Sequence, residues 1–134
     1  MQPSSELQTI ISAWFTAWEP LPGGKPVWHH RHLSRKNELH TIGTDPAEWL
    51  EGEQAFEHMQ AEMNKVGILK FSPGRIEAWQ EGTVGWGIAQ PTLTTPKGVR
   101  ISIRWSAVFH REDNEWKMVQ LHMSIGVPNH ELLG

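Results

Sequence analysis

The sequence predicts an α+β fold, with N-terminal helices packed on one face of a curved antiparallel sheet. Apolar residues recur at helical spacing in the first part of the chain, and from Ile68 onward the spacing changes to the period of two that is typical of strands. Helices followed by a run of strands are the order expected of an α+β domain. The 134 residues (1–134) are expected to form one domain, because domains average ~150 residues.

The first segment of the chain is predicted to be an amphipathic helix. Its apolar side chains fall on one helical face, and they are Leu7, Ile10, Ile11, Trp14, Phe15 and Trp18. Ser5 with Gln8 is expected to form a capping box at its start, and Pro20 is expected to end it.

A second helix is predicted to begin at Asp45, after a short strand at residues 39–41. Asp45 can cap the helix, Pro46 suits the first turn, and Glu48 can close a capping box. Gly52 is expected to divide this helix into two pieces, and Gly67 is expected to end the second piece.

Four strands are predicted to follow, over residues 75–80, 83–93, 99–111 and 116–125. Asp113-Asn114 is expected to form the turn of the last hairpin.

Alternation places two sets of side chains on opposite faces of the last two strands. The inner set is wholly apolar: Ile101, Ile103, Trp105, Ala107, Phe109, Val119, Leu121, Met123 and Ile125. The outer set is mostly polar: Arg100, Ser102, Arg104, Ser106, Val108, His110, Met118, Gln120, His122 and Ser124.

Composition excludes several classes of protein. The formal net charge of −3 leaves no basic surplus for phosphate neutralisation, so no nucleic-acid partner is expected. The absence of cysteine excludes a disulfide scaffold and a thiol nucleophile. No apolar run is long enough to span a membrane and no signal peptide is evident, so a cytoplasmic protein with no membrane partner is expected.

Three motifs resemble those of a known family. The stretch from Arg111 to Val119, followed by His122-x-Ser124, resembles the closing hairpin of SnoaL-like domains, which belong to the nuclear transport factor 2-like (ketosteroid isomerase-like) superfamily. The stretches from Ile42 to Trp49 and from Glu81 to Trp86 resemble the same family in the same order. The resemblance implies a cone-shaped α+β barrel with a pocket between the helices and the concave sheet, and a homodimer built on the outer face of the sheet.

The same resemblance leaves two kinds of function open. One is the binding of a small apolar or aromatic molecule with isomerase, cyclase or dehydratase chemistry, which needs no cofactor because a general base and hydrogen-bond donors suffice. The other is a non-catalytic ligand-sensing or assembly module. An ionisable side chain that is buried and points into the cone would favour the enzyme.

Large apolar side chains are the expected walls of the pocket, since indoles supply flat apolar area and one N–H donor. The predicted pocket residues are Trp14, Trp18, Trp49, Phe56, Met59, Trp86, Trp105, Leu121 and Met123.

The inner faces of the two longest strands carry no ionisable side chain, so a general base would have to come from the helices or from the connecting segment. The candidates are His30, His122 and Asp45. Each has an alternative role: His30 as a surface histidine, His122 as a hydrogen-bonding residue at the dimer interface, and Asp45 as a helix cap. His29, His30 and His32 have no carboxylate or cysteine at ligand spacing, so no metal site is predicted.

The outer face of the sheet is the expected dimer interface. Its predicted contact residues are Arg104, Ser106, Gln120, His122 and Ser124.

Overall fold

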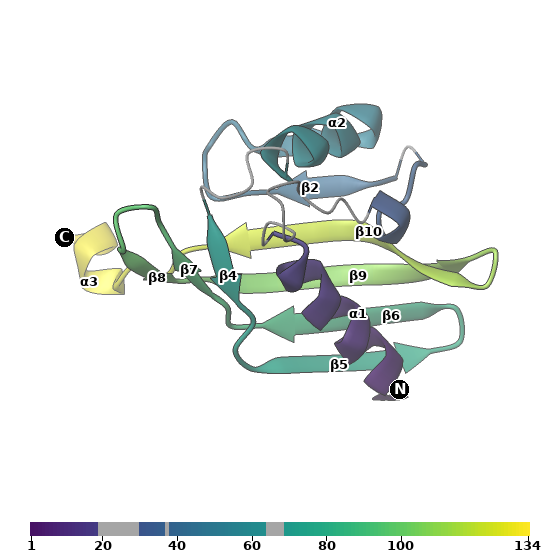
Figure 1. Cartoon of the computed structure of the whole chain (residues 1–134). Helices are drawn as coiled ribbons and strands as arrows, with labels where there is room; N and C mark the ends of the chain where they lie inside the picture. Colours follow the sequence, from purple (N-terminus) through teal and green to yellow (C-terminus); the bar gives the residue numbers. More distant parts are fainter. Residues whose placement is uncertain (19–29, 37, 64–68) are drawn as a thin grey trace.

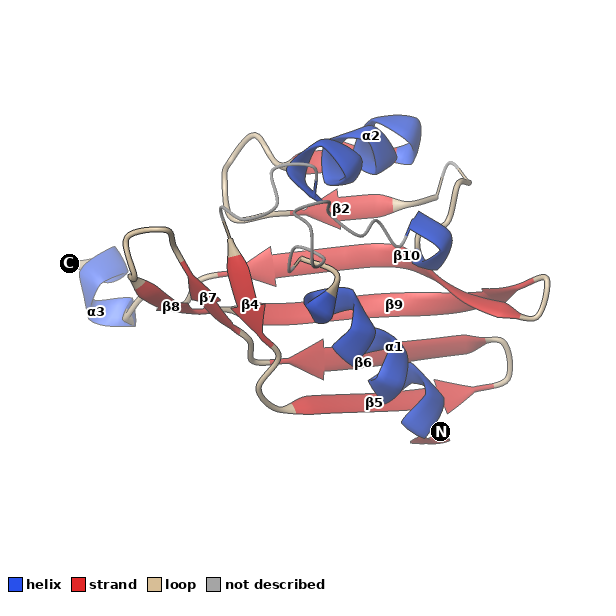
Figure 2. Ribbon diagram, in the orientation of Figure 1, coloured by secondary structure: helices blue, strands red, loops and turns tan. Residues whose placement is uncertain are grey.

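The computed structural model describes residues 1–18, 30–36, 38–63 and 69–134. Helices lie mainly on one face of a large twisted sheet, and a small second sheet lies at one end (Figures 1 and 2). The elements in chain order are β1 (Gln2–Pro3), α1 (Ser5–Thr16), η1 (His30–His32), β2 (His40–Ile42), β3 (Trp49–Glu51), α2 (Gly52–Met63), β4 (Lys70–Ser72), β5 (Ile76–Glu81), β6 (Val84–Ala89), β7 (Thr92–Thr94), β8 (Arg100–Ser102), β9 (Arg104–Glu112), β10 (Glu115–Ser124) and α3 (Asn129–Leu133).

The large sheet has seven strands in the order β1-β5-β6-β9-β10-β2-β3. Its pairs are antiparallel except β10 and β2, which run parallel, so the sheet is mixed rather than purely antiparallel. The small sheet has the order β4-β7-β8. The predicted α+β class and the cone-like arrangement are confirmed, although the large sheet does not close into a barrel.

Helix α1 forms where its apolar spacing predicts, but it begins one residue earlier than the predicted cap implies. Ser4, not Ser5, is the N-cap, and its hydroxyl accepts a hydrogen bond from the Leu7 N–H at 3.2 Å. Pro20, the predicted stop, and Gly67, the predicted end of the second helix, lie outside the described residues.

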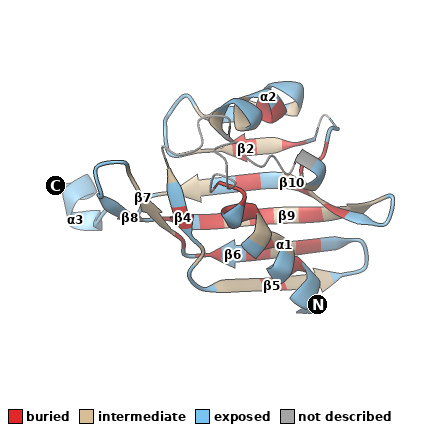
Figure 3. Ribbon diagram, viewed as in Figure 1, coloured by how far each residue is buried: buried red, intermediate tan, exposed pale blue. Residues whose placement is uncertain are grey.

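The core lies between α1 and the inner face of the sheet, as the buried residues of Figure 3 show. Gly85 and Gly87 let the helix approach β6, because a Cβ at either position would collide with the Leu7 or Ile11 side chain of α1. The glycines therefore occupy the inner face, and Trp86 between them faces outward. It stacks there on Trp79, with ring centroids 6.1 Å apart.

The register of β10 shifts between Met118 and Gln120, where a bulge adds a residue to the strand. Met118 is consequently fully buried opposite Phe109, and Val119 lines a groove on the outer face. The predicted faces of these two residues were therefore wrong, because the extra residue of a bulge interrupts the alternation of side chains between the two faces. The predicted hairpin turn is confirmed, because Asp113 and Asn114 have φ values of 51° and 66°.

Two of the predicted strands are each broken in two. The run 83–93 divides into β6 and β7 at Gln90-Pro91, and the run 99–111 divides into β8 and β9 at Ile103. Pro91 cannot donate to a strand ladder, while its carbonyl accepts a hydrogen bond from the Ile103 N–H at 2.9 Å. The chain thereby leaves the large sheet and forms the small one.

The helix predicted to begin at Asp45 starts only at Gly52. Residues 43–48 form a turn, and the residues after it pair with β2 as strand β3. The capping interactions expected of Asp45 and Glu48 do form, but they close a turn between two strands rather than a helix. In the described part of the chain, no helix is long and apolar enough to cross a membrane.

Candidate functional site

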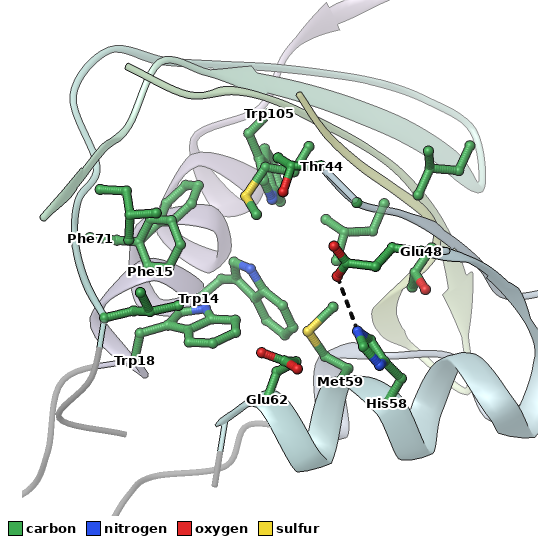
Figure 4. A pocket seen from close by; sticks show the side chains of 17 residues that line it. Trp14, Phe15, Trp18, Thr44, Glu48, His58, Met59, Glu62, Phe71 and Trp105 are labelled. Carbon is green, nitrogen blue, oxygen red and sulfur yellow. Dashed lines mark hydrogen bonds and ion pairs between the residues drawn. The ribbon is translucent and has the colours of Figure 1, made fainter. Parts of the chain in front are cut away.

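A pocket of about 180 Å³ lies between α1, α2, the β2–β3 hairpin and the inner face of the sheet (Figure 4). It is slightly larger than the ~150 Å³ apolar cavity that accepts benzene in an engineered protein. Its described lining residues are Trp14, Phe15, Trp18, Thr41, Ile42, Gly43, Thr44, Glu48, His58, Met59, Glu62, Leu69, Phe71, Leu93, Trp105, Leu121 and Met123.

Aromatic rings form one wall of this pocket. Phe15 lies 5.2 Å from Trp105 in an edge-on arrangement and 5.8 Å from Phe71, centroid to centroid. Trp18 meets Phe71 edge-on at 5.3 Å. Aromatic rings prefer such edge-on and tilted contacts, and together these rings present an apolar surface suited to a flat ligand.

A carboxylate–imidazole pair forms the facing wall. His58 Nε2 lies 3.1 Å from Glu48 Oε2, and the two side chains are 32% and 30% exposed (Figure 4). Glu62 follows His58 by one helical turn and lines the same pocket. Ionisable groups therefore face the apolar wall across the cavity.

The β2–β3 turn holds Glu48 in place. Its Oε1 accepts a hydrogen bond from the Asp45 N–H at 2.9 Å, and its backbone carbonyl accepts one from the Gly43 N–H at 2.8 Å. The carboxyl group lies directly on Gly43, since a Cβ there would come within 2.8 Å of Glu48 Cδ and Oε2. Position 43 must therefore lack a side chain for the carboxylate to reach His58.

Helix α2 presents His58 to the pocket. Ala55 and Phe56 are buried and fix the helix against the rest of the core. The Arg35 guanidinium covers the Phe56 ring at 3.7 Å and pairs with Glu53 at 2.8 Å, which ties the start of α2 to the segment before β2.

The geometry assigns different parts to the two members of the pair. Both Glu48 oxygens already have hydrogen-bonding partners, Asp45 N–H at one and the imidazole at the other. When His58 Nε2 carries the proton shared with Glu48, Nδ1 holds the free lone pair. Within the described residues no hydrogen bond engages that Nδ1 atom, so it is available as a proton acceptor.

A family model for the SnoaL-like domain matches residues 28–128, well over half of the sequence. The chain belongs to the SnoaL-like domain family. No curated protein matches the sequence significantly.

Solved structures share the fold of this SnoaL-like chain. An NTF2-like protein of unknown function from Pseudomonas putida KT2440 superposes with a TM-score of 0.69 at 12% identity, covering 94% of this chain and 91% of the other. A proposed ketosteroid isomerase from Parabacteroides distasonis ATCC 8503 gives 0.59 at 17% identity, with coverage of 75% and 74%. A proposed dehydratase of the NTF2-like family from Streptomyces avermitilis gives 0.59 at 15% identity, with coverage of 67% of each chain. At these identities the likeness concerns the fold alone.

Six of the predicted pocket residues line the pocket of the SnoaL-like chain. They are Trp14, Trp18, Met59, Trp105, Leu121 and Met123. The other three lie elsewhere. Trp49 is 68% exposed because its neighbour Leu50 takes the inner position opposite Thr41. Phe56 is buried beneath Arg35, and Trp86 faces outward between two glycines.

Two of the three predicted catalytic residues, Asp45 and His122, are not among the described lining residues of the pocket. Asp45 is exposed and its carboxylate accepts a hydrogen bond from the Ala47 N–H at 2.8 Å, so it closes the turn instead. His122 is exposed on the outer face, opposite Ser106. His30 begins η1, and its side chain lies outside the described part of the chain.

Sequence reasoning missed His58 and Glu62, and it explained Glu48, like Asp45, first as a capping residue. His58 lies on a helix and Glu48 on the segment before it, the two parts of the chain from which the sequence analysis expected a general base to come. Helical spacing carried a signal, since His58 follows Ala55 and Glu62 follows Met59 by three residues, at the border of the apolar face.

Proposed function

We propose that this SnoaL-like domain binds a small, mainly apolar ring compound and transfers a proton on it without a cofactor, as an isomerase- or dehydratase-type enzyme. The Glu48–His58 pair facing an aromatic wall is the observation that carries the proposal. Two fold neighbours with proposed isomerase and dehydratase activities are consistent with it.

The proposed step needs one base and one acidic C–H bond. His58 Nδ1 takes the proton from a carbon beside an electron-withdrawing group, so that the C–H bond breaks and an N–H bond forms. The electron pair moves into the substrate and gives an enolate-type anion. The imidazolium is stabilised by the Glu48 carboxylate at 3.1 Å, and it returns the proton to the same or another atom of the substrate.

Proton–deuterium exchange tests this step without knowledge of the natural substrate. Acetophenone is a flat ketone with exchangeable methyl protons, and NMR in D₂O follows their loss. The wild-type protein is expected to accelerate this exchange, and His58→Gln is expected to lower the acceleration by about 100-fold.

His40→Gln is the matched control, because His40 Nε2 also lies 3.1 Å from a carboxylate, Glu51 Oε2, but outside the pocket. Exchange in this variant should stay within about twofold of the wild-type rate, since a base outside the pocket cannot reach the probe. Binding of acetophenone with no acceleration by the wild type would overturn the enzymatic proposal and leave a ligand-binding domain. Equal losses in His40→Gln and His58→Gln would also contradict it.

We also propose a homodimer through the outer face of the sheet. That face carries Arg104, Ser106, Gln120, His122 and Ser124, together with the Trp79–Trp86 stack, and the nearby Val84 and Ile88 are exposed. A second copy would cover these apolar side chains. Light scattering after size-exclusion chromatography should give a dimer mass for the wild type and a monomer mass for Ile88→Glu. A monomeric wild type would refute the dimer.

A further inference from the structure

One buried hydroxyl in the pocket has no hydrogen-bond partner among the residues that the structure describes. Thr41, in the middle of β2, is 5% exposed. The two other buried hydroxyls in the described ranges are hydrogen-bonded, since Ser4 accepts from the Leu7 N–H and Ser34 donates to Glu112. Over the described ranges, no hydrogen bond involves the Thr41 hydroxyl. Buried polar groups are normally satisfied, so this exception requires an explanation.

The pairing of β2 with its neighbouring strands does not explain the unpaired Thr41 hydroxyl. Thr41 pairs with Leu121 of β10 on one side and with Leu50 of β3 on the other, so its backbone is placed within two ladders. The side chain is directed to the inner face and lines the pocket. Among the described side chains, only Trp116 Nε1 is both fully hidden from solvent and unpaired. The Thr41 oxygen therefore retains accessible surface toward the cavity.

Thr41 also lies beside the acid–base pair. Thr41 and Gly43 share one face of the hairpin, two residues and about 6.6 Å apart along the strand. The Glu48 carboxyl group rests on Gly43. A ligand held at the Thr41 hydroxyl would thus be adjacent to the Glu48–His58 pair and in front of the aromatic wall.

We propose that Thr41 is the polar anchor of the pocket, and that its hydroxyl donates a hydrogen bond to the carbonyl oxygen of a small, neutral cyclic or aryl ketone. The inference rests on the proposed function for its location and adds the substrate class. Glu48 and Glu62 both line the cavity, so a carboxylate or phosphate ligand would meet like charge. A carbonyl beside the scissile C–H bond is also the group that turns proton removal into enolate formation, and a donor at its oxygen stabilises that charge.

A matched pair of probes tests the anchor by binding alone. Acetophenone and α-methylstyrene have the same flat shape, but the second has a CH₂ group in place of the carbonyl oxygen. Dissociation constants for both are measured by ligand-observed NMR with the wild type, Thr41→Val and Thr41→Ser. Valine keeps the β-branched shape without the hydroxyl, and serine keeps the hydroxyl.

The wild type is expected to prefer acetophenone, and Thr41→Val to reduce that preference by about fivefold while the affinity for α-methylstyrene is unchanged. Thr41→Ser should restore most of the preference. An equal ratio of dissociation constants in wild type and Thr41→Val, or no restoration by serine, would overturn the anchor. Failure of both probes to bind would overturn the ligand pocket together with the anchor. Loss of proton exchange with this binding pattern intact would count only against the acid–base chemistry.

Discussion

Two histidine–glutamate pairs in this molecule share one geometry and differ in surroundings. His58–Glu48 and His40–Glu51 each have an Nε2–Oε2 distance of 3.1 Å. His40 and Glu51 face each other across β2 and β3, with side chains 40% and 71% exposed. His40 Nδ1 is also engaged, 2.8 Å from the Glu38 carbonyl oxygen. His58 instead has a free Nδ1 among the described contacts and an aromatic wall opposite.

The comparison teaches that a hydrogen-bonded pair alone does not make a site. Water screens the exposed pair, and such pairs contribute little to stability or chemistry. The pocket pair lies where apolar side chains lower the local dielectric and where a ligand can reach it. The two pairs therefore differ in their surroundings and not in their own geometry. Variants that alter these surroundings test this comparison.

The largest expected effect comes from Phe56→Ala. The His58–Glu48 pair depends on α2, which Phe56 anchors, whereas the His40–Glu51 pair lies on two paired strands. Removing this buried ring should lower the free energy of unfolding by about 3 kcal/mol, as measured by urea denaturation. Glu57→Ala on the exposed side of the same helix is the control and should change it by less than about 0.5 kcal/mol. Similar small losses in both variants would show that Phe56 does not anchor the helix.

Glu48→Gln should come next. The glutamine oxygen can still accept the Asp45 N–H, which places its NH₂ group against His58 Nε2 and forces the proton to Nδ1. The imidazole is then the wrong tautomer to act as a base, so exchange of acetophenone protons should slow on the order of 30-fold. The matched variant Glu51→Gln should leave the rate unchanged. An unaltered rate in Glu48→Gln would mean that Glu48 does not orient the imidazole.

Gly43→Ala should have a smaller effect on the same rate. The new methyl group would displace the Glu48 carboxylate, and exchange should fall about tenfold. No positive φ marks this glycine, so the backbone accepts alanine and the protein should remain folded by circular dichroism. Full activity in Gly43→Ala would show that the carboxylate does not need its observed position.

The smallest effect is expected from the exposed pair itself. Glu51→Gln should change the free energy of unfolding by less than about 0.5 kcal/mol, because a solvated ion pair contributes little. Urea denaturation at low and high salt checks this. A loss above about 1 kcal/mol would contradict the view that the two pairs differ in surroundings rather than in geometry.

Much of the fold could be predicted from local signals. The apolar spacing of α1, the Asp113-Asn114 turn and the apolar inner face of β9 each reflect interactions within a few residues or a simple alternation. The errors arose where contacts with distant elements determine which face a side chain occupies. Trp86 faces outward because α1 needs glycine on either side of it, and Met118 is buried because β10 bulges against β9.

The candidate site divides in the same way. The sequence by itself determined the α+β order of elements, the indole-rich inner surface and the lack of ionisable groups on the inner faces of the long strands, since periodicity within each segment sets these. Only the tertiary structure decided that a turn carboxylate and a helix imidazole, ten residues apart, meet across the pocket. Glu48 and His58 come together because α2 packs back over the β2–β3 hairpin. The position of α2 depends on Ala55 and Phe56, which pack into the core against residues distant in the sequence. A pattern within one segment does not encode such long-range contacts.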